Sequence, residues 1–295
     1  MPAAVAPSPT TLADVVTALG DIPLHRVLWN PRPGTATESD ALRAAAGEPK
    51  LRAELVDRIL VLKGIRRDDL TAYAPAVVTL ADVIDRLGGI PLDRIVWTPF
   101  PGTATEADAV ALIEGDPKRL VELVDDILVE KPMGFREGLL AGWLITCLNN
   151  FVVPRRLGRV GAPDTIVRLL GRQVRLPDVS YYPFAVLAAA GGSRTRVGTV
   201  APAIACEILS DSNTRAEIER KRREYFAAGS SLVWIVDPRN ETVDVFTTAS
   251  AGTTLTVADT LDGGTVLLGF QLPVAELFGY LDEPTSEAAP SESQS

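Results

Sequence analysis

The amino-acid sequence predicts an α/β fold, of the α+β kind, that is preceded by a duplicated segment. The first observation is a pair of apolar runs, residues 203–209 and 232–237, separated by the helix-forming residues 213–225. The order strand, helix, strand is that of a βαβ unit, in which both parallel strands end at the same side of the sheet. The second observation is an internal repeat in the first half of the chain.

The repeat begins with Thr-Leu-Ala-Asp-Val at Thr11 and begins again with the same five residues at Thr79. A residue of the second copy therefore carries the number of its counterpart plus 68. We name residues 11–63 copy one and residues 79–131 copy two. The match continues without gaps to the ends of both copies, where the shared charged positions are Glu54 and Glu122, then Lys63 and Lys131.

Each copy is expected to form a short helix, a proline-rich turn, a second helix and a strand, with Thr37 or Thr105 capping the second helix. After copy one the chain continues into a linker, residues 64–78, that is rich in alanine and proline towards its end. Copy one lacks the candidate catalytic residues described below. We therefore interpret it as an accessory partial repeat that serves self-association.

Composition excludes several classes of function. The single histidine, His25, excludes Ser-His-Asp and Cys-His catalysis and histidine-rich zinc sites. The net charge of −9 does not indicate a nucleic-acid partner by itself, but arginines gather within residues 155–175 and 215–223. Local basic clusters of this kind supply phosphate contacts, although the same arginines are also typical of a solvated surface.

The chain is expected to be cytoplasmic. Cys147 and Cys206 lie in apolar contexts that are typical of free thiols in a reducing compartment. Residues 1–10 lack the basic and apolar regions of a signal peptide, and no apolar run reaches the length of a membrane span. Residues 1–10 and the acidic tail, residues 283–295, are expected to be disordered because their composition cannot bury a core.

The candidate site consists of Asp178, Glu207 and Lys221. Glu207 interrupts a strand that is otherwise apolar, and a buried carboxylate is costly unless it is paired or holds a metal. It shares a strand face with Ala203 and Ala205, whose small side chains leave room for an ion and a phosphate. With Asp178 on a neighbouring strand, two carboxylates suit Mg²⁺. Lys221 would stabilise an anionic transition state or lower the pKa of an attacking water.

These residues and their neighbours resemble the Uma2 family of restriction-endonuclease-like proteins, in the PD-(D/E)XK nuclease superfamily. The matching words are Pro177-Asp178, residues 206–210, Lys221 with Tyr225, and the flanking segments 130–134 and 229–236. The resemblance covers about residues 79–280. It implies a restriction-endonuclease-like mixed sheet flanked by helices, in a nuclease-like domain at residues 79–282.

Two positions depart from the expected pattern. The superfamily lysine stands two residues after the glutamate, where this chain has Leu209, and the family resemblance places the lysine on the next helix, at Lys221. Asp211 stands where the resemblance leads us to expect proline. That change leaves the expected metal ligands in place but alters the local turn and the charge near the metal.

The resemblance implies a metal-dependent endonuclease that hydrolyses phosphodiester bonds in DNA. Asp178, Glu207 and the backbone carbonyl of Ile208 would bind Mg²⁺ or Mn²⁺, and the enzyme could act as a homodimer. Glu137 and Tyr225 are possible supporting residues. The alternatives are that Glu137 only complements the N-terminus of a helix, and that Tyr225 only supports packing.

Two other interpretations of the whole site remain open. The first is a catalytically inactive binding or interaction protein that keeps the nuclease fold. The second is purely structural: Asp178 and Glu207 would pair with nearby arginines, so that neutral substitutions would unfold the protein.

The remaining elements follow from local patterns. Apolar residues at helical spacing predict a helix over residues 135–152. Residues 160–179 are expected to form a hairpin around Gly171, with Pro177 at a strand end. Residues 191–198 are expected to form a basic loop, and short strands are expected in residues 242–247 and 255–277. Ser212 or Asn213 is expected to cap the following helix, and Glu217 is expected to form a capping box with Asn213 or Thr214.

Overall fold

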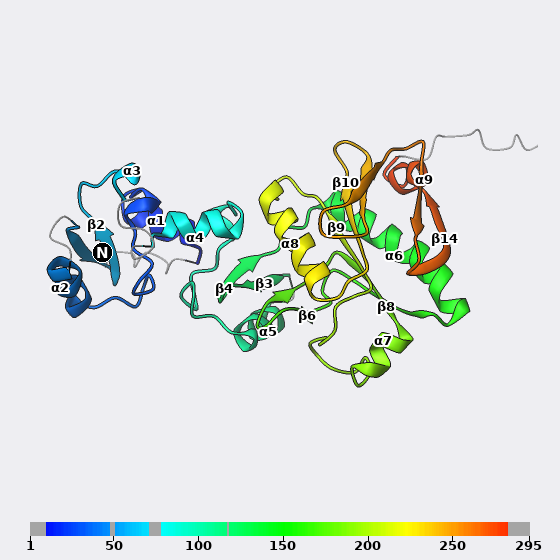
Figure 1. Cartoon of the computed structure of the whole chain (residues 1–295), viewed down its shortest axis with the longest axis horizontal. Helices are drawn as coiled ribbons and strands as arrows, with labels where there is room; N and C mark the ends of the chain where they lie inside the picture. The colour runs from blue at the N-terminus through cyan, green and yellow to red at the C-terminus, as the bar shows by residue number, and fades with distance from the viewer. Residues whose placement is uncertain (1–9, 48–50, 71–77, 117, 283–295) are drawn as a thin grey trace, which may run out of the picture.

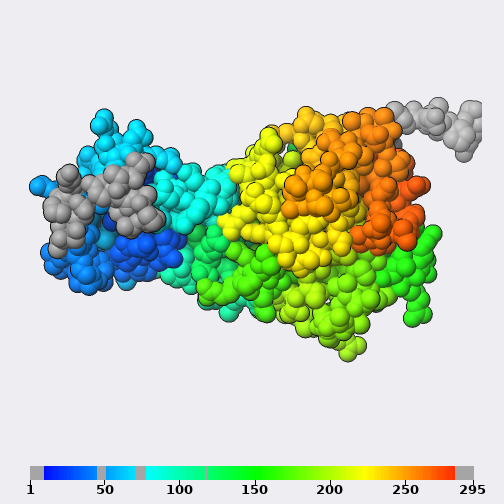
Figure 2. Space-filling model, viewed as in Figure 1, coloured from blue at the N-terminus to red at the C-terminus, as the bar shows by residue number. Residues whose placement is uncertain are grey.

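The computed structural model is elongated, with copy one at one end and a larger α/β body at the other (Figure 1). The structure describes residues 10–47, 51–70, 78–116 and 118–282. The expected disordered termini, residues 1–9 and 283–295, and residues 71–77 of the expected linker lie outside the described residues. In the space-filling view, copy one forms a lobe that joins the larger body through copy two (Figure 2).

A six-stranded mixed sheet forms the centre of the larger body, as the sequence predicts. Its two central strands, β9 (Ile204–Ile208) and β10 (Leu232–Asp237), are parallel and are joined by helix α8 (Arg215–Ala227). This arrangement confirms the βαβ unit. The other strands are antiparallel to their neighbours and complete the order β12-β11-β10-β9-β8-β5, with β5 (Gly158–Gly161), β8 (Val179–Pro183), β11 (Thr242–Phe246) and β12 (Gly252–Leu255).

Helices cover both faces of this sheet. Helix α6 (Phe135–Arg155) packs on one face and shares a core with strands β8, β9 and β10, which confirms the predicted helix. Short helix α7 (Phe184–Ala189) follows β8. The C-terminal elements extend the α6 core: β13 (Thr260–Gly263), β14 (Leu267–Pro273) and α9 (Val274–Gly279). Helix α8 covers the opposite face, where Tyr225 packs against Ala205.

Helix α8 begins one residue later than the sequence suggests. Its N-cap is Thr214, which accepts from the backbone N–H of Glu217 at 3.1 Å and forms a capping box with it. The prediction that Ser212 or Asn213 is the cap was wrong, because Asn213 instead accepts from the backbone N–H of Ser210 at 3.0 Å. Of the two residues expected to form a capping box with Glu217, Thr214 is the one that does so. Gly229 follows the helix with a φ of 108°, as expected for a glycine that ends a helix.

Both copies contain a β-hairpin where the sequence pattern predicts one strand. The turn residues are Asp57-Arg58 in copy one and Asp125-Asp126 in copy two, all with φ between 46° and 62°. Two consecutive left-handed residues form the tight turn of a two-residue hairpin, which the uninterrupted apolar pattern concealed. Copy one contains α1 (Leu12–Ala18), η1 (Leu24–Arg26), α2 (Glu38–Gly47), β1 (Ala53–Val56) and β2 (Ile59–Leu62), with α3 (Arg67–Leu70) after it.

The hairpin of copy two is built into the larger body. Copy two contains α4 (Leu80–Leu87), η3 (Leu92–Arg94), α5 (Glu106–Gly115), β3 (Val121–Val124) and β4 (Ile127–Glu130). Its strand β3 pairs with β7 (Val174–Arg175), which forms a hairpin with β6 (Val167–Arg168). This confirms the hairpin expected around Gly171. The resulting four-stranded sheet, β4-β3-β7-β6, lies beside the central sheet. Within the residues that the structure describes, no helix is both long and apolar enough to cross a membrane.

Candidate active site

Asp178 and Glu207 lie opposite one another on adjacent strands. Val179 of β8 pairs with Cys206 of β9, so the antiparallel register places Asp178 across from Glu207. Residues that face each other in this way project on the same side of a sheet. The backbone N–H of Ile208 donates to Asp178 Oδ2 at 2.7 Å, and both carboxylates are buried, with 4% and 3% of their surface exposed. The structure therefore brings together the two acids that the sequence singles out.

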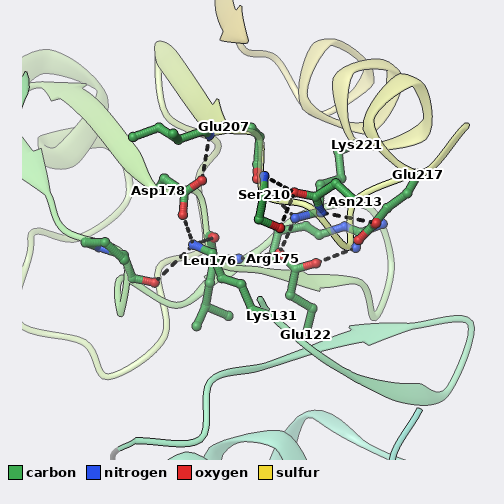
Figure 3. A network of polar contacts seen from close by, with 12 residues as sticks. Glu122, Lys131, Arg175, Leu176, Asp178, Glu207, Ser210, Asn213, Glu217 and Lys221 are labelled. Atoms are coloured by element: carbon green, nitrogen blue, oxygen red, sulfur yellow. Dashed lines mark hydrogen bonds and ion pairs between the residues drawn. The ribbon is translucent and has the colours of Figure 1, made fainter. Parts of the chain in front are cut away.

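Helix α8 places Lys221 against Glu207, one of the two acids (Figure 3). Its ammonium Nζ lies 3.0 Å from Glu207 Oε2, and the side chain is 1% exposed. One turn later, the hydroxyl of Tyr225 donates to Glu207 Oε1 at 2.6 Å. The room expected above Ala205 is taken by Tyr225, which packs on that alanine. Both oxygens of Glu207 are thus held by side chains of one helix face, as the four-residue spacing of Lys221 and Tyr225 requires.

Three further charged residues complete the site, and none of them is among the site residues predicted from the sequence. Lys131, at the end of the copy-two hairpin, lies 2.8 Å from Asp178 Oδ1. Glu122, on β3, lies 3.1 Å from Lys221 Nζ. Arg175, on β7, donates to Glu122 Oε2 at 2.8 Å. Figure 3 shows Glu122 and Lys131 approaching the site from the hairpin below it.

A signal for these residues was present in the sequence. Glu122 interrupts the apolar run of residues 120–124 in the same way that Glu207 interrupts its strand. Because the hairpin was not foreseen, its two strands could not be placed beside Asp178 and Lys221. The purely structural alternative named arginines as the partners of the two candidate acids. The direct partners are instead lysines, Lys131 at Asp178 and Lys221 at Glu207.

The buried charges around the site balance. Three carboxylates, Glu122, Asp178 and Glu207, contact three cations, Lys131, Arg175 and Lys221. Arg175 also contacts Glu224, whose charge is balanced in turn by Arg220. Ion pairs of this kind are tolerated in an interior only when they are mutually compensated and hydrogen-bonded. The cluster joins the copy-two hairpin, β7, β8, β9 and α8, so it links every element that surrounds the site.

The pKa values of the acids separate under this arrangement. Burial raises the pKa of Glu207, and the positive charge of Lys221 lowers it. The nearby carboxylates of Asp178 and Glu122 raise it again, so the pKa lies above its usual value. Burial also acts on Glu122, but Lys221 and Arg175 outweigh it and lower the pKa of Glu122 to about 2. Burial disfavours the charged form of Lys221, yet Glu122 and Glu207 reverse that effect and raise its pKa. Glu122 and Lys221 are therefore charged at neutral pH, and Glu207 is the acid that takes up a proton more readily.

Comparison with known proteins identifies the family of the chain. The model of the Uma2 family, described as "Putative restriction endonuclease", matches residues 107–275, which is more than half of the chain. The chain belongs to the Uma2 family. The matched region, which we call the Uma2 domain, contains all six charged residues of the cluster, whereas copy one precedes it. Family membership supports a nuclease function and a nucleic-acid substrate.

A solved structure shares the fold of the Uma2 domain. It is a crystal structure from Anabaena variabilis of a protein described as a putative nuclease belonging to DUF820. The two chains are 18% identical, with a TM-score of 0.52, and the match covers 58% of this chain and 98% of the other. The likeness confirms the predicted restriction-endonuclease-like mixed sheet flanked by helices. No curated protein matches the chain.

The candidate ligands in the Uma2 domain are oxygen atoms, the ligand type that a hard divalent cation prefers. Asp178 and Glu207 offer carboxylate oxygens from one sheet face, and such a cation needs few protein ligands because water and phosphate complete its shell. Ile208, whose carbonyl is the expected third ligand, is the residue that donates its N–H to Asp178. The described residues contain no group of three or more His, Cys, Asp or Glu side chains placed to hold a metal. A bound cation would therefore have to displace the ammonium of Lys131 or Lys221 from its carboxylate.

Glu137 lies in a different environment from the charged cluster. It occupies the first turn of α6 and is 7% exposed, and its partner is the adjacent Arg136 at 3.1 Å. Arg136 also approaches Asp211 to 3.8 Å, and Arg239 donates to Asp211 at 2.9 Å. Asp211, which replaces the expected proline, thus forms an exposed ion pair. The position of Glu137 matches the alternative in which it complements the helix N-terminus.

Copy two supports the helix that carries Lys221. Arg94, at the end of η3, forms a buried ion pair with Glu217 of α8, with 2.7 Å between Nη2 and Oε1. Gly88 ends α4 with a φ of 93°, and a Cβ at this position would lie 2.6 Å from the backbone nitrogen of Glu217. Only glycine allows this left-handed conformation together with so close an approach. The start of α8 is therefore seated directly on copy two.

Proposed function

We propose that this protein is a Mg²⁺- or Mn²⁺-dependent endonuclease that hydrolyses phosphodiester bonds in DNA. The observation that carries the proposal is the pairing of two buried carboxylates, Asp178 and Glu207, on one sheet face with Lys221 on one of them. Two acids and a lysine in one cluster match the chemistry of metal-assisted phosphodiester hydrolysis. Membership of the Uma2 family supports the same reaction class.

Each residue has a distinct role in this proposal. Asp178, Glu207 and the carbonyl of Ile208 would hold the cation, which when bound supplies Lewis-acid polarisation of the phosphate and a more acidic water. Lys221 orients the attacking water or neutralises charge that develops on the phosphate. Tyr225 fixes the orientation of Glu207 through its 2.6 Å hydrogen bond. Glu122 holds Lys221 charged and in place when Glu207 turns towards a ligand.

Two cavities are candidates for holding the nucleic-acid strand, although neither is lined by Asp178, Glu207 or Lys221. One, of about 330 Å³, is lined by Arg159, Tyr182, Arg196 and part of the expected basic loop. Asp178 immediately precedes β8, and Tyr182 lies on β8 four residues later. Because side chains alternate along a strand, the two project on the same face of the sheet. The other cavity, of about 420 Å³, lies at the C-terminal ends of β9 and β10. Its charged lining residues are three arginines and three acids, namely Arg215, Arg222, Arg239, Glu219, Asp237 and Asp244. In this proposal the arginines of both cavities contact phosphates of the bound strand.

The proposal is tested by incubating the full chain with supercoiled plasmid and Mg²⁺ or Mn²⁺, with and without a chelator. We expect metal-dependent cleavage that Lys221→Ala abolishes while circular dichroism shows that the variant is folded. Single-stranded DNA and RNA are assayed in parallel, because the fold alone does not choose among them. A thermal-unfolding series checks metal binding without turnover, since a ligand at a hundred times its Kd stabilises by about 2.7 kcal/mol. Absence of cleavage on all three substrates would contradict the proposal.

The cleavage rate should fall on the acid side at a higher pH than an ordinary glutamate would cause. The pKa of Glu207 is raised above its usual value of 4.5, so protons compete with the metal at a pH where exposed glutamates are fully ionised. The pKa of Lys221 is raised above 10.5, so Lys221 should stay charged and cause no fall in the cleavage rate at any pH below 10.5. The measurement is kcat/KM against pH at subsaturating metal, and an acid limb at or below pH 4.5 would contradict the assignment.

A catalytically inactive binding protein is the second candidate function. The observation in its favour is that Asp178, Glu207 and Lys221 are each at most 4% exposed and already have protein partners. Lys131 and the Ile208 N–H contact Asp178, Lys221 and Tyr225 contact Glu207, and Glu122 also contacts Lys221. Under this alternative, DNA binding would persist in the plasmid assay mixture without cleavage. The cytoplasmic location and the boundaries of the expected domains stay predictions.

A further inference from the structure

The two copies of the repeat exchange their first helices. Helix α1 of copy one packs against η3 of copy two, and helix α4 of copy two packs against η1 of copy one. The two helices lie close together between the two copies (Figure 1). Each copy therefore completes the other, instead of folding as a separate unit.

The exchanged contacts are reciprocal at the level of single hydrogen bonds. The backbone N–H of Leu12 donates to the carbonyl of Ile95 at 2.8 Å, and Leu80, the counterpart of Leu12, donates to Val27, the counterpart of Ile95, at 2.7 Å. A second pair repeats the relation at the next residues. In this pair, the backbone N–H of Trp97 donates to the carbonyl of Thr10 at 3.0 Å, and the backbone N–H of Trp29 donates to the carbonyl of Val78 at 2.9 Å.

One apolar core contains equivalent residues from both copies. Side chains from α1, α4 and the two hairpins form a single cluster, in which nearly every position of copy one is matched by its counterpart in copy two. The most deeply buried matched pairs are Leu12 and Leu80, Val27 and Ile95, Ile59 and Ile127, and Val61 and Val129. Neither copy could bury this surface without the other.

Reciprocal contacts of this kind are those of a two-fold homodimer, in which residue i of one protomer contacts residue j of the other and the reverse. Here both halves belong to one chain. We propose that copy one is a built-in substitute for a second protomer. It occupies the self-association face of copy two, formed by α4, η3 and residues 95–97, so the intact chain is a monomer.

Copy one brings the association half of a protomer without a catalytic half. It retains Glu54 and Lys63, the counterparts of Glu122 and Lys131, and these pair at 2.6 Å with side chains 39% and 55% exposed. The repeat match stops at Lys63, so copy one has no counterparts of Asp178, Glu207 and Lys221. The closed pair leaves the chain with one candidate active site.

The single site has a consequence for cleavage, which rests on the proposed nuclease function. A two-fold dimer presents two centres to the two strands of a duplex, whereas this monomer presents one. Each binding event should therefore cut one strand. With supercoiled plasmid, nicked circles should accumulate first, and linear DNA should appear only after many nicks.

The association is tested without reference to activity. Light scattering during size-exclusion chromatography should give the mass of one chain, 31.5 kDa, over a wide range of protein concentration. A protease site is then placed in the segment 71–77 and cleaved, and the two fragments should still elute together in a 1:1 ratio. A dimeric intact chain, or fragments that separate, would overturn the inference.

Two variants locate the interface. After cleavage, Leu12→Asp should release the N-terminal fragment, because Leu12 is 2% exposed within the shared core. Leu42→Asp, on α2, is the matched control and should leave the fragments together, because Leu42 is 72% exposed. Retention of the fragment by Leu12→Asp, or its release by Leu42→Asp alone, would show that this face does not hold the copies. Because these measurements need no turnover, an inactive protein would leave the result on association intact.

Discussion

Replacing Glu207 with glutamine is expected to lower the rate of metal-dependent cleavage on the order of a thousandfold. Glutamine keeps the shape of glutamate but removes the negative charge that would hold the cation beside Asp178. Metal stabilisation of a transition state contributes several kcal/mol, and each ~1.4 kcal/mol corresponds to a tenfold change in rate. Lys221 keeps Glu122 as a partner in this variant, so the fold should persist. Single-turnover cleavage of plasmid measures the effect.

The matched control is Glu276→Gln. Glu276 is an exposed residue of α9, on the side of the central sheet that α6 covers, away from Lys221 and α8. This variant should cleave at the rate of the unsubstituted protein. If Glu207→Gln is folded and retains more than a tenth of the activity, Glu207 cannot be the principal metal ligand.

The largest effect on stability is expected from Glu122→Gln. This change leaves Lys221 with Glu207 as its carboxylate contact and takes from Arg175 its fully buried carboxylate partner, so that only the partly buried Glu224 remains. Removing one member of a buried ionic cluster typically costs about 3–5 kcal/mol, because a desolvated charge loses its compensation. Urea unfolding followed by circular dichroism would measure the free energy of unfolding.

The repeat provides an internal control for this prediction. Glu54 is the counterpart of Glu122 in copy one and makes a partly exposed ion pair with Lys63. Exposed pairs contribute at most about 1 kcal/mol, so Glu54→Gln should change stability little. Equal effects of the two substitutions would mean that the charged cluster around Lys221 does not depend on Glu122.

The sequence was sufficient to predict the elements whose patterns are local or carried by the resemblance. The βαβ unit followed from two apolar strands around a polar helix, and the opposed positions of Asp178 and Glu207 agree with their expected place on neighbouring strands. The four-residue spacing of Lys221 and Tyr225 placed both on one helix face, where each contacts Glu207.

What the sequence did not reveal depends on contacts between distant segments. Glu122 contacts Lys221, and Lys131 contacts Asp178. Both reach the site because a two-residue turn at Asp125-Asp126 folds the chain back along the preceding strand. Apolar periodicity does not distinguish one long strand from such a hairpin. The exchange of α1 and α4 was equally hidden, because a repeat in sequence does not state which copy each helix joins.

The reciprocal pairing of α1 and α4 also bears on how the chain folds. The bond from Leu12 to Ile95 joins residues far apart in sequence, and the same bond could form between two chains during folding. A short tether gives the internal partner an effective concentration in the millimolar range, so intramolecular pairing wins in dilute solution. At protein concentrations approaching that value, refolding should instead yield chains linked through exchanged helices, as in domain swapping. Purification of this protein should therefore favour dilute refolding.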